Sequence, residues 1–97
     1  MNIVILGSTG SIGSSTLKVI AENSGKFSLN LLTANSNDER LLDQCKKFCP
    51  KYAYMADQAA SKRLRQKIIK ENLTTEVLTE EKDLHEIIAS DDTELVV

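Results

Sequence analysis

The chain has 97 residues, 27% of them charged, and a formal net charge of −2. This length supports one small hydrophobic core, and the absence of a net positive charge argues against nucleic-acid binding. No apolar run approaches the roughly 20 residues that cross a bilayer, and no basic segment followed by an apolar one opens the chain. We therefore expect a soluble, cytoplasmic protein without a nucleic-acid or membrane partner.

The first part of the chain predicts a strand, a helix and a second strand. Residues 2–6 are nearly all apolar, as in a strand that is covered on both faces and lies centrally in a sheet. After a glycine-rich turn, residues spaced as on one helix face form a predicted buried stripe: Ile12, Thr16, Val19 and Ile20. This helix is expected to end near Asn23 and Gly25. Residues 27–34 predict the second strand.

A second helix is predicted to begin after Asn37, a residue type that caps helices. Asp38 and Glu39 then lie in the first turn, where negative charge complements the helix dipole. The predicted apolar face consists of Leu41, Leu42, Cys45 and Phe48. Pro50 is expected to end this helix, because proline cannot continue it.

The two cysteines, Cys45 and Cys49, are four residues apart, and His85 is a distant third candidate ligand. Zinc sites normally need three or four ligands at closer spacing. We therefore expect no metal site and two reduced cysteines, with Cys45 packed as a small apolar residue.

The second half repeats the alternation of strand and helix. Residues 52–55 predict a third strand, and Asp57 is expected to cap a third helix. The predicted buried stripe of this helix is Ala60, Leu64 and Ile68. Its basic residues are expected to form a solvated face: Lys62, Arg63, Arg65, Lys67 and Lys70. Residues 75–78 predict an edge strand, Leu84, Ile87 and Ile88 mark a fourth helix, and residues 94–97 begin a fifth strand.

This alternation predicts an α/β fold of the Rossmann type, with three αβα layers and a mostly parallel sheet. The most apolar strands are the first, second and fifth, and we expect them to lie centrally. The fifth strand is then expected to return beside the first. The crevice between these two strands would be the switch point, where ligands bind in such folds.

The glycine-rich run Gly7-Ser8-Thr9-Gly10-Ser11-Ile12-Gly13 directly follows the first strand and opens the first helix. In this position Gly7 permits a tight exit from the strand, Gly10 lets the backbone approach a pyrophosphate, and Gly13 lets the helix lie close to the sheet. The expected pyrophosphate donors are backbone N–H groups and hydroxyls of Thr9, Ser11 and Ile12. The spacing is a variant of the usual G-x-G-x-x-G, and the alternative is a glycine-rich turn that binds nothing.

The end of the second strand bears on the choice of nucleotide. NAD-specific domains carry an acidic residue there, about 20 residues beyond the loop. Here Asn35, Ser36 and Asn37 occupy this segment, and the first carboxylate is Asp38. This favours NADPH, with these three residues as predicted contacts of the ribose phosphate and Arg40 as the nearest cation. Asn37 is equally well explained as an N-cap.

The run from Ile5 to Gly13, followed by Ser15-Thr16-Leu17, resembles the N-terminal signature of the 1-deoxy-D-xylulose 5-phosphate reductoisomerase family. The similarity continues through Asn37, Gln44 and residues 48–53, 76–78 and 95–97. The resemblance implies an enzyme, a homodimer, that uses NADPH and a divalent metal (Mg or Mn). It would convert 1-deoxy-D-xylulose 5-phosphate to 2-C-methyl-D-erythritol 4-phosphate in non-mevalonate isoprenoid biosynthesis.

By the same resemblance, Thr9, Gly10, Ser11 and Ile12 contact the cofactor pyrophosphate and its ribose. Asn37 matches a second family cluster, whereas Asn35 stands in place of glycine and Ser36 in place of the lysine of some members.

The resemblance also implies that residues 1–97 are the N-terminal part of the NAD(P)-binding domain. The family's metal-binding, substrate-binding and lid residues then lie beyond Val97, so no catalytic or metal-binding residue is assigned, and the chain alone is expected to be inactive. Two alternatives stay open. One is another Rossmann oxidoreductase, of the aspartate-semialdehyde-dehydrogenase or extended short-chain type, although a Tyr-x-x-x-Lys pair is missing. The other is a non-enzymatic nucleotide-sensing module.

Overall fold

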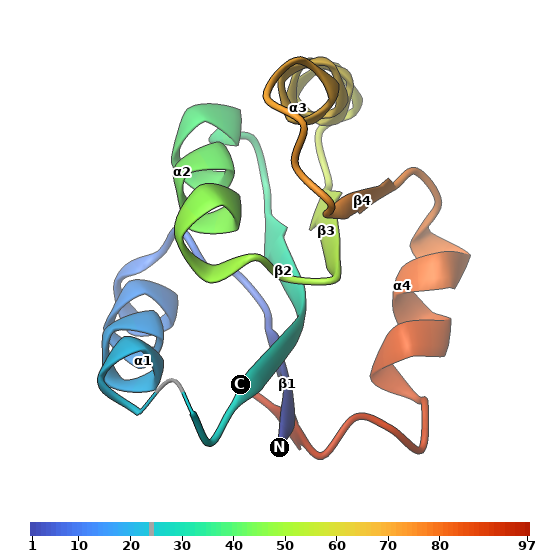
Figure 1. Ribbon diagram of the computed structural model, residues 1–97. Helices are drawn as coiled ribbons and strands as arrows, with labels where there is room; N and C mark the ends of the chain where they lie inside the picture. Colours follow the sequence, from blue (N-terminus) through green and yellow to red (C-terminus); the bar gives the residue numbers. More distant parts are fainter. Residues whose placement is uncertain (24) are drawn as a thin grey trace.

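The computed structural model describes residues 1–23 and 25–97. It contains one parallel sheet in the strand order β4-β3-β2-β1-β5 (Figure 1). The strands are β1 (Asn2–Ile5), β2 (Ser28–Ala34), β3 (Tyr52–Met55), β4 (Glu76–Leu78) and β5 (Leu95–Val96). The helices are α1 (Ser11–Glu22), α2 (Asp38–Phe48), α3 (Gln58–Lys70) and α4 (Glu81–Ile88). No helix in the described ranges has the length and apolar character needed to cross a membrane.

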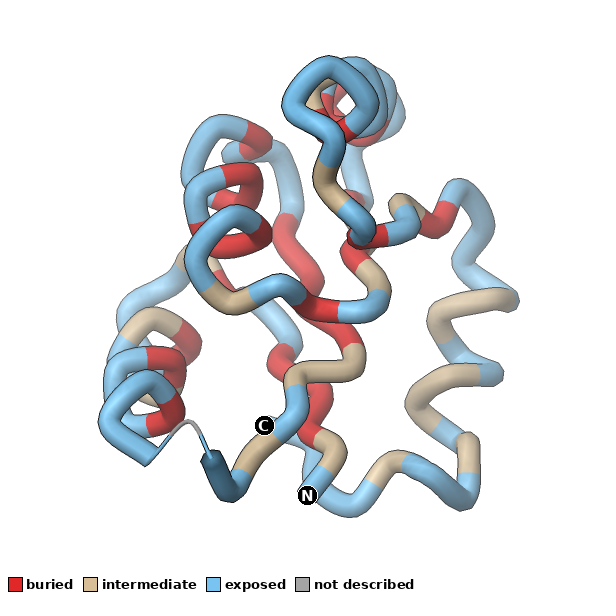
Figure 2. The backbone as a smooth tube through the Cα atoms, in the orientation of Figure 1, coloured by how far each residue is buried: buried red, intermediate tan, exposed pale blue. Residues whose placement is uncertain are grey.

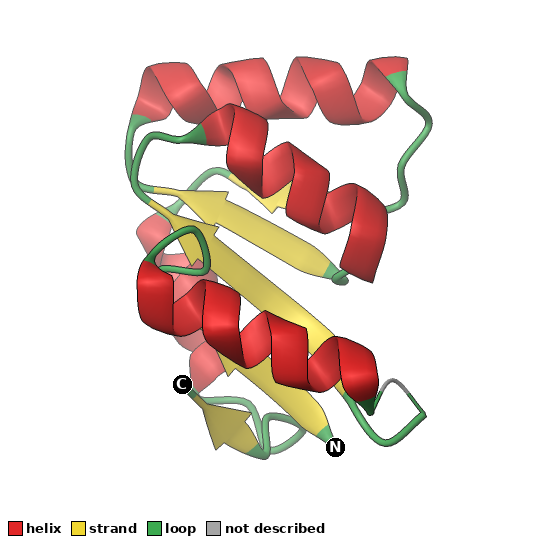
Figure 3. Cartoon of the chain, turned by 90° about the vertical axis from the view of Figure 1, so that its left-hand side faces the viewer, coloured by secondary structure: helices red, strands yellow, loops and turns green. Residues whose placement is uncertain are grey.

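The predicted three-layer α/β arrangement is confirmed. Helices α1, α2 and α3 cover one face of the sheet, and α4 covers the other (Figures 1 and 3). Alternate residues of β1 divide between the two faces: Ile3 and Ile5 pack in the larger core with α1–α3, and Val4 packs with residues of α4. Figure 2 shows the buried positions along the strands and on the inner sides of α1, α2 and α3.

The strand order confirms that the fifth strand returns beside the first. Val97 donates its N–H to the Val4 carbonyl at 2.9 Å, and Leu6 donates to the Val97 carbonyl at 3.0 Å. The central position expected for β5 is wrong within the described residues, because β5 ends the sheet and leaves Leu95 43% exposed and Val96 42% exposed. The edge position expected for β4 is confirmed.

The predicted buried face of α1 is wrong at Ile12 and Val19, whereas Ile20 is buried and Thr16 is half-buried. Ile12 is 76% exposed and Val19 is 56% exposed, whereas Gly13 and Leu17 are buried. Close packing at Gly13 explains the difference, because turning this glycine toward the sheet necessarily turns its neighbour Ile12 toward solvent. Gly13, Leu17 and Ile20 then follow one another at helical spacing on the inner face.

The predicted helix caps and the inner faces of α2 and α3 are confirmed. The Asn37 side chain accepts a hydrogen bond from the Arg40 N–H at 3.1 Å, and the Asp57 side chain accepts one from the Ala60 N–H at 2.9 Å. The predicted core positions of both helices are buried except for half-buried Phe48: Leu41, Leu42, Cys45, Ala60, Leu64 and Ile68. The basic face of α3, predicted to be solvated, is solvated only in part. Two of its cations, Arg63 and Lys67, bind the buried carboxylate of Asp38 on α2.

Both cysteines are free, as predicted. Cys45 is buried, and burial raises the pKa of its thiol to about 11. At neutral pH this thiol is therefore protonated and packs as an apolar group. Cys49 is exposed and ends α2 in the left-handed conformation with φ 49°, immediately before Pro50.

Candidate nucleotide-binding site

The glycine-rich loop lies at the carboxyl end of β1, and its geometry requires glycine at Gly7. This residue has φ +67°, a conformation that side chains with a Cβ rarely adopt. The Gly10 N–H donates to the Gly7 carbonyl at 3.0 Å and closes a tight turn. The predicted role of Gly7, a sharp exit from the strand, is confirmed.

Gly13 brings the first turn of α1 directly onto this loop. A Cβ at position 13 would lie 2.5 Å from the Gly7 carbonyl oxygen and 2.7 Å from the Ser8 Cα. Both neighbours are backbone atoms, which cannot move aside without distorting the loop. The expected close approach of the helix at Gly13 is confirmed. A Cβ at Gly10 would meet the Gly7 oxygen at 3.3 Å, a milder contact.

The N-terminus of α1 directly follows the loop, and neither a side-chain cap nor a carboxylate of its first turn occupies its free N–H groups. Gly10 is the N-cap, no side chain among the described residues caps the helix there, and no acidic residue lies in its first turn. The first helical hydrogen bond runs from the Ser14 N–H to the Gly10 carbonyl at 2.9 Å. The N–H groups of Ser11, Ile12 and Gly13 precede this bond, so they lack intrahelical acceptors and carry the positive end of the helix dipole.

Buried polar contacts support the loop from below. Ser8 is fully buried; its hydroxyl donates to Gln44 Oε1 at 2.7 Å, and Gln44 Nε2 donates to the Ser8 carbonyl at 2.8 Å. Thr33 of β2 adds two further contacts, accepting the Gly7 N–H at its hydroxyl and the Ser8 N–H at its carbonyl. The Ser8 side chain, within the glycine-rich run, is therefore directed into the interior, where it supports the loop, and a contact of Ser8 with the cofactor stays a prediction.

Sequence reasoning did not identify Gln44 or Thr33 as parts of this site. Gln44 did carry a signal, because it lies on the same face of the α2 sequence as Leu41 and Cys45. A polar residue at a core position needs a hydrogen-bond partner. Its partner, Ser8, is 36 residues away in the sequence, so the pair becomes visible only in the folded chain.

A depression of about 500 Å³ lies at the predicted switch point, between the loop and the end of β5. It is lined by Leu6, Gly7, Gly10, Ser11, Ile12, Gly13 and Val97. Three of the four predicted pyrophosphate residues, Gly10, Ser11 and Ile12, thus face a common space, whereas Thr9 does not line it. A larger depression of about 790 Å³ lies between α3 and α4, but it contains none of the predicted site residues, and we do not assign the nucleotide to it.

The second predicted cluster, Asn35, Ser36 and Asn37, is exposed at the carboxyl end of β2. Because β1 and β2 are parallel neighbours, both clusters lie at the same edge of the sheet. Asn37 can act both as a helix cap and as a ligand contact. Its Oδ1 caps α2, and its amide Nδ2 is left as a donor toward a ligand. Positive φ outside glycine occurs in the described chain only at Cys49 and Asn72, so Asn35 needs no left-handed backbone.

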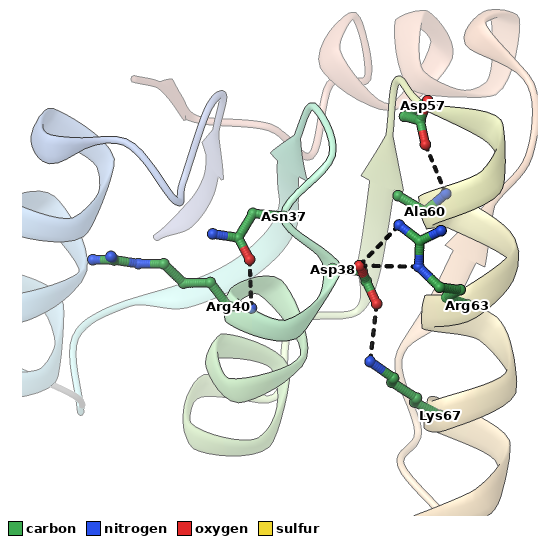
Figure 4. Close-up of polar contacts among 7 residues, drawn as sticks. All are labelled: Asn37, Asp38, Arg40, Asp57, Ala60, Arg63 and Lys67. Carbon is green, nitrogen blue, oxygen red and sulfur yellow. Dashed lines mark hydrogen bonds and ion pairs between the residues drawn. The ribbon is translucent and has the colours of Figure 1, made fainter.

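Asp38, the first carboxylate after this cluster, points away from the site (Figure 4). Its Oδ1 accepts from Arg63 at 3.2 and 3.3 Å, and its Oδ2 accepts from Lys67 at 2.9 Å. Desolvation alone would raise the pKa of the Asp38 carboxyl, but the hydrogen bonds and charges of Lys67 and Arg63 outweigh it and lower the pKa. The carboxylate is ionised at neutral pH and its charge is compensated on the α3 side.

The parallel sheet, the glycine-rich turn between β1 and α1, and a depression at the switch point define a Rossmann-type α/β domain. The family model of 1-deoxy-D-xylulose 5-phosphate reductoisomerase matches residues 3–97, and the chain belongs to this family. The two alternatives, another Rossmann oxidoreductase and a nucleotide-sensing module outside this family, are thereby superseded.

Individual relatives agree with this assignment. The reductoisomerase of Saccharophagus degradans is 49% identical over 88 residues, and that of Haemophilus ducreyi is 44% identical over 96 residues. A crystal structure of DOX-P reductoisomerase in complex with NADPH, fosmidomycin and magnesium superposes with a TM-score of 0.89 at 30% identity, covering 99% of this chain and 23% of that one. The two sequence alignments include 91% and 99% of this chain, respectively. They span only 22% and 24% of the lengths of those two relatives.

Proposed function

We propose that residues 1–97 form the N-terminal part of an NAD(P)-binding domain and bind NADPH at the depression beside the glycine-rich loop. The observation that carries this proposal is the α1 N-terminus, which has no side-chain cap among the described residues, no acidic first turn and an open space in front of it. Such a terminus offers unpaired N–H donors and partial positive charge to an anion. A pyrophosphate fits both properties.

Each residue of the loop contributes through its backbone or its size. We assign the pyrophosphate and its ribose to Thr9, Gly10, Ser11 and Ile12, with Gly7 and Gly13 shaping the path of the chain. Because Gly10 has no Cβ, the backbone leaves room for phosphate oxygens next to the helix start. Asn35, Ser36 and Asn37 are placed to meet the adenosine ribose and its phosphate from the end of β2.

For the full-length protein we propose the activity of its family, the conversion of 1-deoxy-D-xylulose 5-phosphate to 2-C-methyl-D-erythritol 4-phosphate. When bound, NADPH supplies a hydride to this reaction. This chain orients the adenine half of the cofactor through the loop and the end of β2. The described residues contain no group of three or more potential metal ligands, and we assign the Mg or Mn ion and the catalytic groups to residues outside 1–97. The chain alone is thus expected to bind cofactor without catalysing the reaction, and we propose a cytoplasmic homodimer for the full-length enzyme.

Calorimetric titration of the chain with NADPH tests this proposal. Gly10→Asp places a carboxylate at the helix start and should weaken binding more than about tenfold, a loss of about 1.4 kcal/mol. Gly25→Asp is the matched control, since it adds the same charge where a Cβ meets no atom within 4 Å. Equal binding by the wild type and Gly10→Asp would exclude the loop as the site. Because residues 1–97 form only half of the crevice, we expect weak binding by the wild type, with a dissociation constant well above the nanomolar range.

A further inference from the structure

The larger depression, of about 790 Å³, lies beyond the carboxyl ends of β3 and β4. Helix α3 follows β3 on one face of the sheet, and α4 follows β4 on the other face (Figures 1 and 3). Connections that leave neighbouring strands toward opposite faces open a crevice between them, and ligands of open α/β sheets bind in such crevices. The fold therefore contains a second crevice of this kind, on the far side of β2 from the glycine-rich loop.

Ser61 lines this depression from the first turns of α3. It is only 8% exposed and lies at helical spacing with the core residues Leu64 and Ile68. The side-chain hydrogen bonds formed with α3 in the described chain do not include the Ser61 hydroxyl. Because every fully enclosed polar side-chain atom of the described residues has a partner, the Ser61 oxygen must keep contact with the depression. A nearly buried hydroxyl is thus left to bind a group from outside the protein.

Unpaired positive charge lines the depression beside Ser61. Lys62 and Arg65 both lie on its α3 side, three residues apart and therefore on neighbouring turns. Neither forms an ion pair with a described residue, whereas two other cations of α3 bind the Asp38 carboxylate. An ammonium, a guanidinium and a hydroxyl thus offer their donors to one space.

Carboxylates occupy the α4 side of the depression. Glu80 and Glu81 line it at the start of α4, where Lys82 pairs with Glu80 at 3.4 Å and His85 lies 3.7 Å from Glu81. An ionised carboxylate only accepts hydrogen bonds, so this side suits the hydroxyl groups of a ligand and repels a second anion. The two sides together fit a molecule with one anionic end and several hydroxyl groups.

We propose that this depression is a second small-molecule site, which binds a phosphate ester of a polyol. Ser61, Lys62 and Arg65 bind the phosphate, and Glu80 and Glu81 accept hydrogen bonds from the hydroxyl groups. A phosphate offers an oxygen acceptor to each of the three donors, and the guanidinium can bind two of its oxygens at once. The proposal does not depend on the nucleotide site, because the two depressions share no lining residue.

The test is a titration of the chain with glycerol 3-phosphate, followed through the backbone amide resonances in NMR spectra at constant ionic strength. Saturable shifts are expected along the lining, including Ser61, Lys62 and Lys82. Arg65→Gln should raise the dissociation constant about tenfold, and Ser61→Ala roughly three- to tenfold. Lys70→Gln is the matched control and should change the constant less than about twofold, since Lys70 is an exposed cation of α3 outside the lining.

Two further ligands and one further variant sharpen the test. Glycerol alone should cause no saturable shift, and inorganic phosphate should bind more weakly than the ester, because it lacks hydroxyl groups. Gly10→Asp should leave the titration unchanged. Shifts confined to residues 10–13, equal effects of Arg65→Gln and Lys70→Gln, or no saturation up to about 50 mM would overturn the proposal. Inorganic phosphate that binds as tightly as the ester would refute a polyol ester as the ligand.

Discussion

Ser8 and Gln44, 36 residues apart, hold each other by two hydrogen bonds of 2.7 and 2.8 Å. Both donors and both acceptors of this pair lie in the buried region beneath the glycine-rich loop. The pair fixes the loop to α2 through Ser8, and the backbone N–H of Ser8 also donates to Thr33 of β2. The shape of the proposed phosphate site therefore depends on a residue that does not face it.

Gln44→Leu is expected to lower the free energy of unfolding by about 2–3 kcal/mol. Leucine has a similar size, but it leaves the Ser8 hydroxyl buried without its acceptor and the Ser8 carbonyl with only the 3.3 Å contact from the Ser14 hydroxyl. Unsatisfied buried groups are costly. Urea denaturation followed by circular dichroism measures the change. Gln66→Leu is the matched control, since Gln66 is exposed on α3 and its replacement should change stability by less than about 0.5 kcal/mol. Equal effects of the two substitutions would contradict a structural role for the pair.

Gly13→Ala is expected to destabilise the fold by about 3 kcal/mol, because its Cβ would lie 2.5 Å from the Gly7 oxygen. Gly25→Ala should be neutral or stabilising by about 0.5 kcal/mol, since the new methyl group meets nothing within 4 Å and the unfolded chain loses entropy. Thermal unfolding of the two variants separates these cases. A Gly13→Ala protein as stable as the wild type would show that α1 can move away from the loop at little cost.

The alternation of strands and helices, the position of β5 beside β1 and the caps at Asn37 and Asp57 were predictable because local pattern and turn chemistry determine them. The inner face of α1 was not. Apolar periodicity placed Ile12 and Val19 in the core, but the close contact at Gly13 sets the rotation of this helix about its axis. Because glycine has no side chain, Gly13 leaves no apolar signal in the sequence that would mark the inner face. The partners of Ser8, Asp38 and Arg40 also escaped prediction, since each is more than 20 residues distant in the sequence.

Acid is expected to weaken the contact between α2 and α3 through Asp38. The lowered pKa means that the folded state favours the ionised carboxylate. This stabilisation is fully present above the ordinary aspartate pKa of about 4 and is lost as the pH falls through the lower pKa of the folded state. Asp38→Asn should cost about 1 kcal/mol at pH 7, a modest value because the Arg63 side chain is 51% exposed.

The check is the free energy of unfolding measured between pH 7 and pH 2 for the wild type, Asp38→Asn and Glu39→Gln. The difference between the wild type and Asp38→Asn should shrink as the pH drops below about 4. Glu39 is exposed in the same helical turn, so its variant reports the general effect of removing a negative charge. A difference between the wild type and Asp38→Asn that stays constant down to pH 2 would mean that the ion pairs do not stabilise the folded state.

The outer edge of β5 is expected to make the isolated chain self-associate. Leu95 is 43% exposed and Val96 42% on this parallel strand, whose outer side is unpaired in the described chain, and Val97 directly after it is 38% exposed. Such an edge offers backbone donors and acceptors, together with apolar side chains, to another strand. Val96→Lys should shift the chain toward monomer in sedimentation velocity experiments, because a charged residue on an edge strand disfavours further pairing. Ile69→Lys removes an equally apolar residue, 72% exposed on α3, and should leave association unchanged. A wild-type chain that stays monomeric at millimolar concentration, or equal effects of the two substitutions, would rule out the β5 edge as the contact.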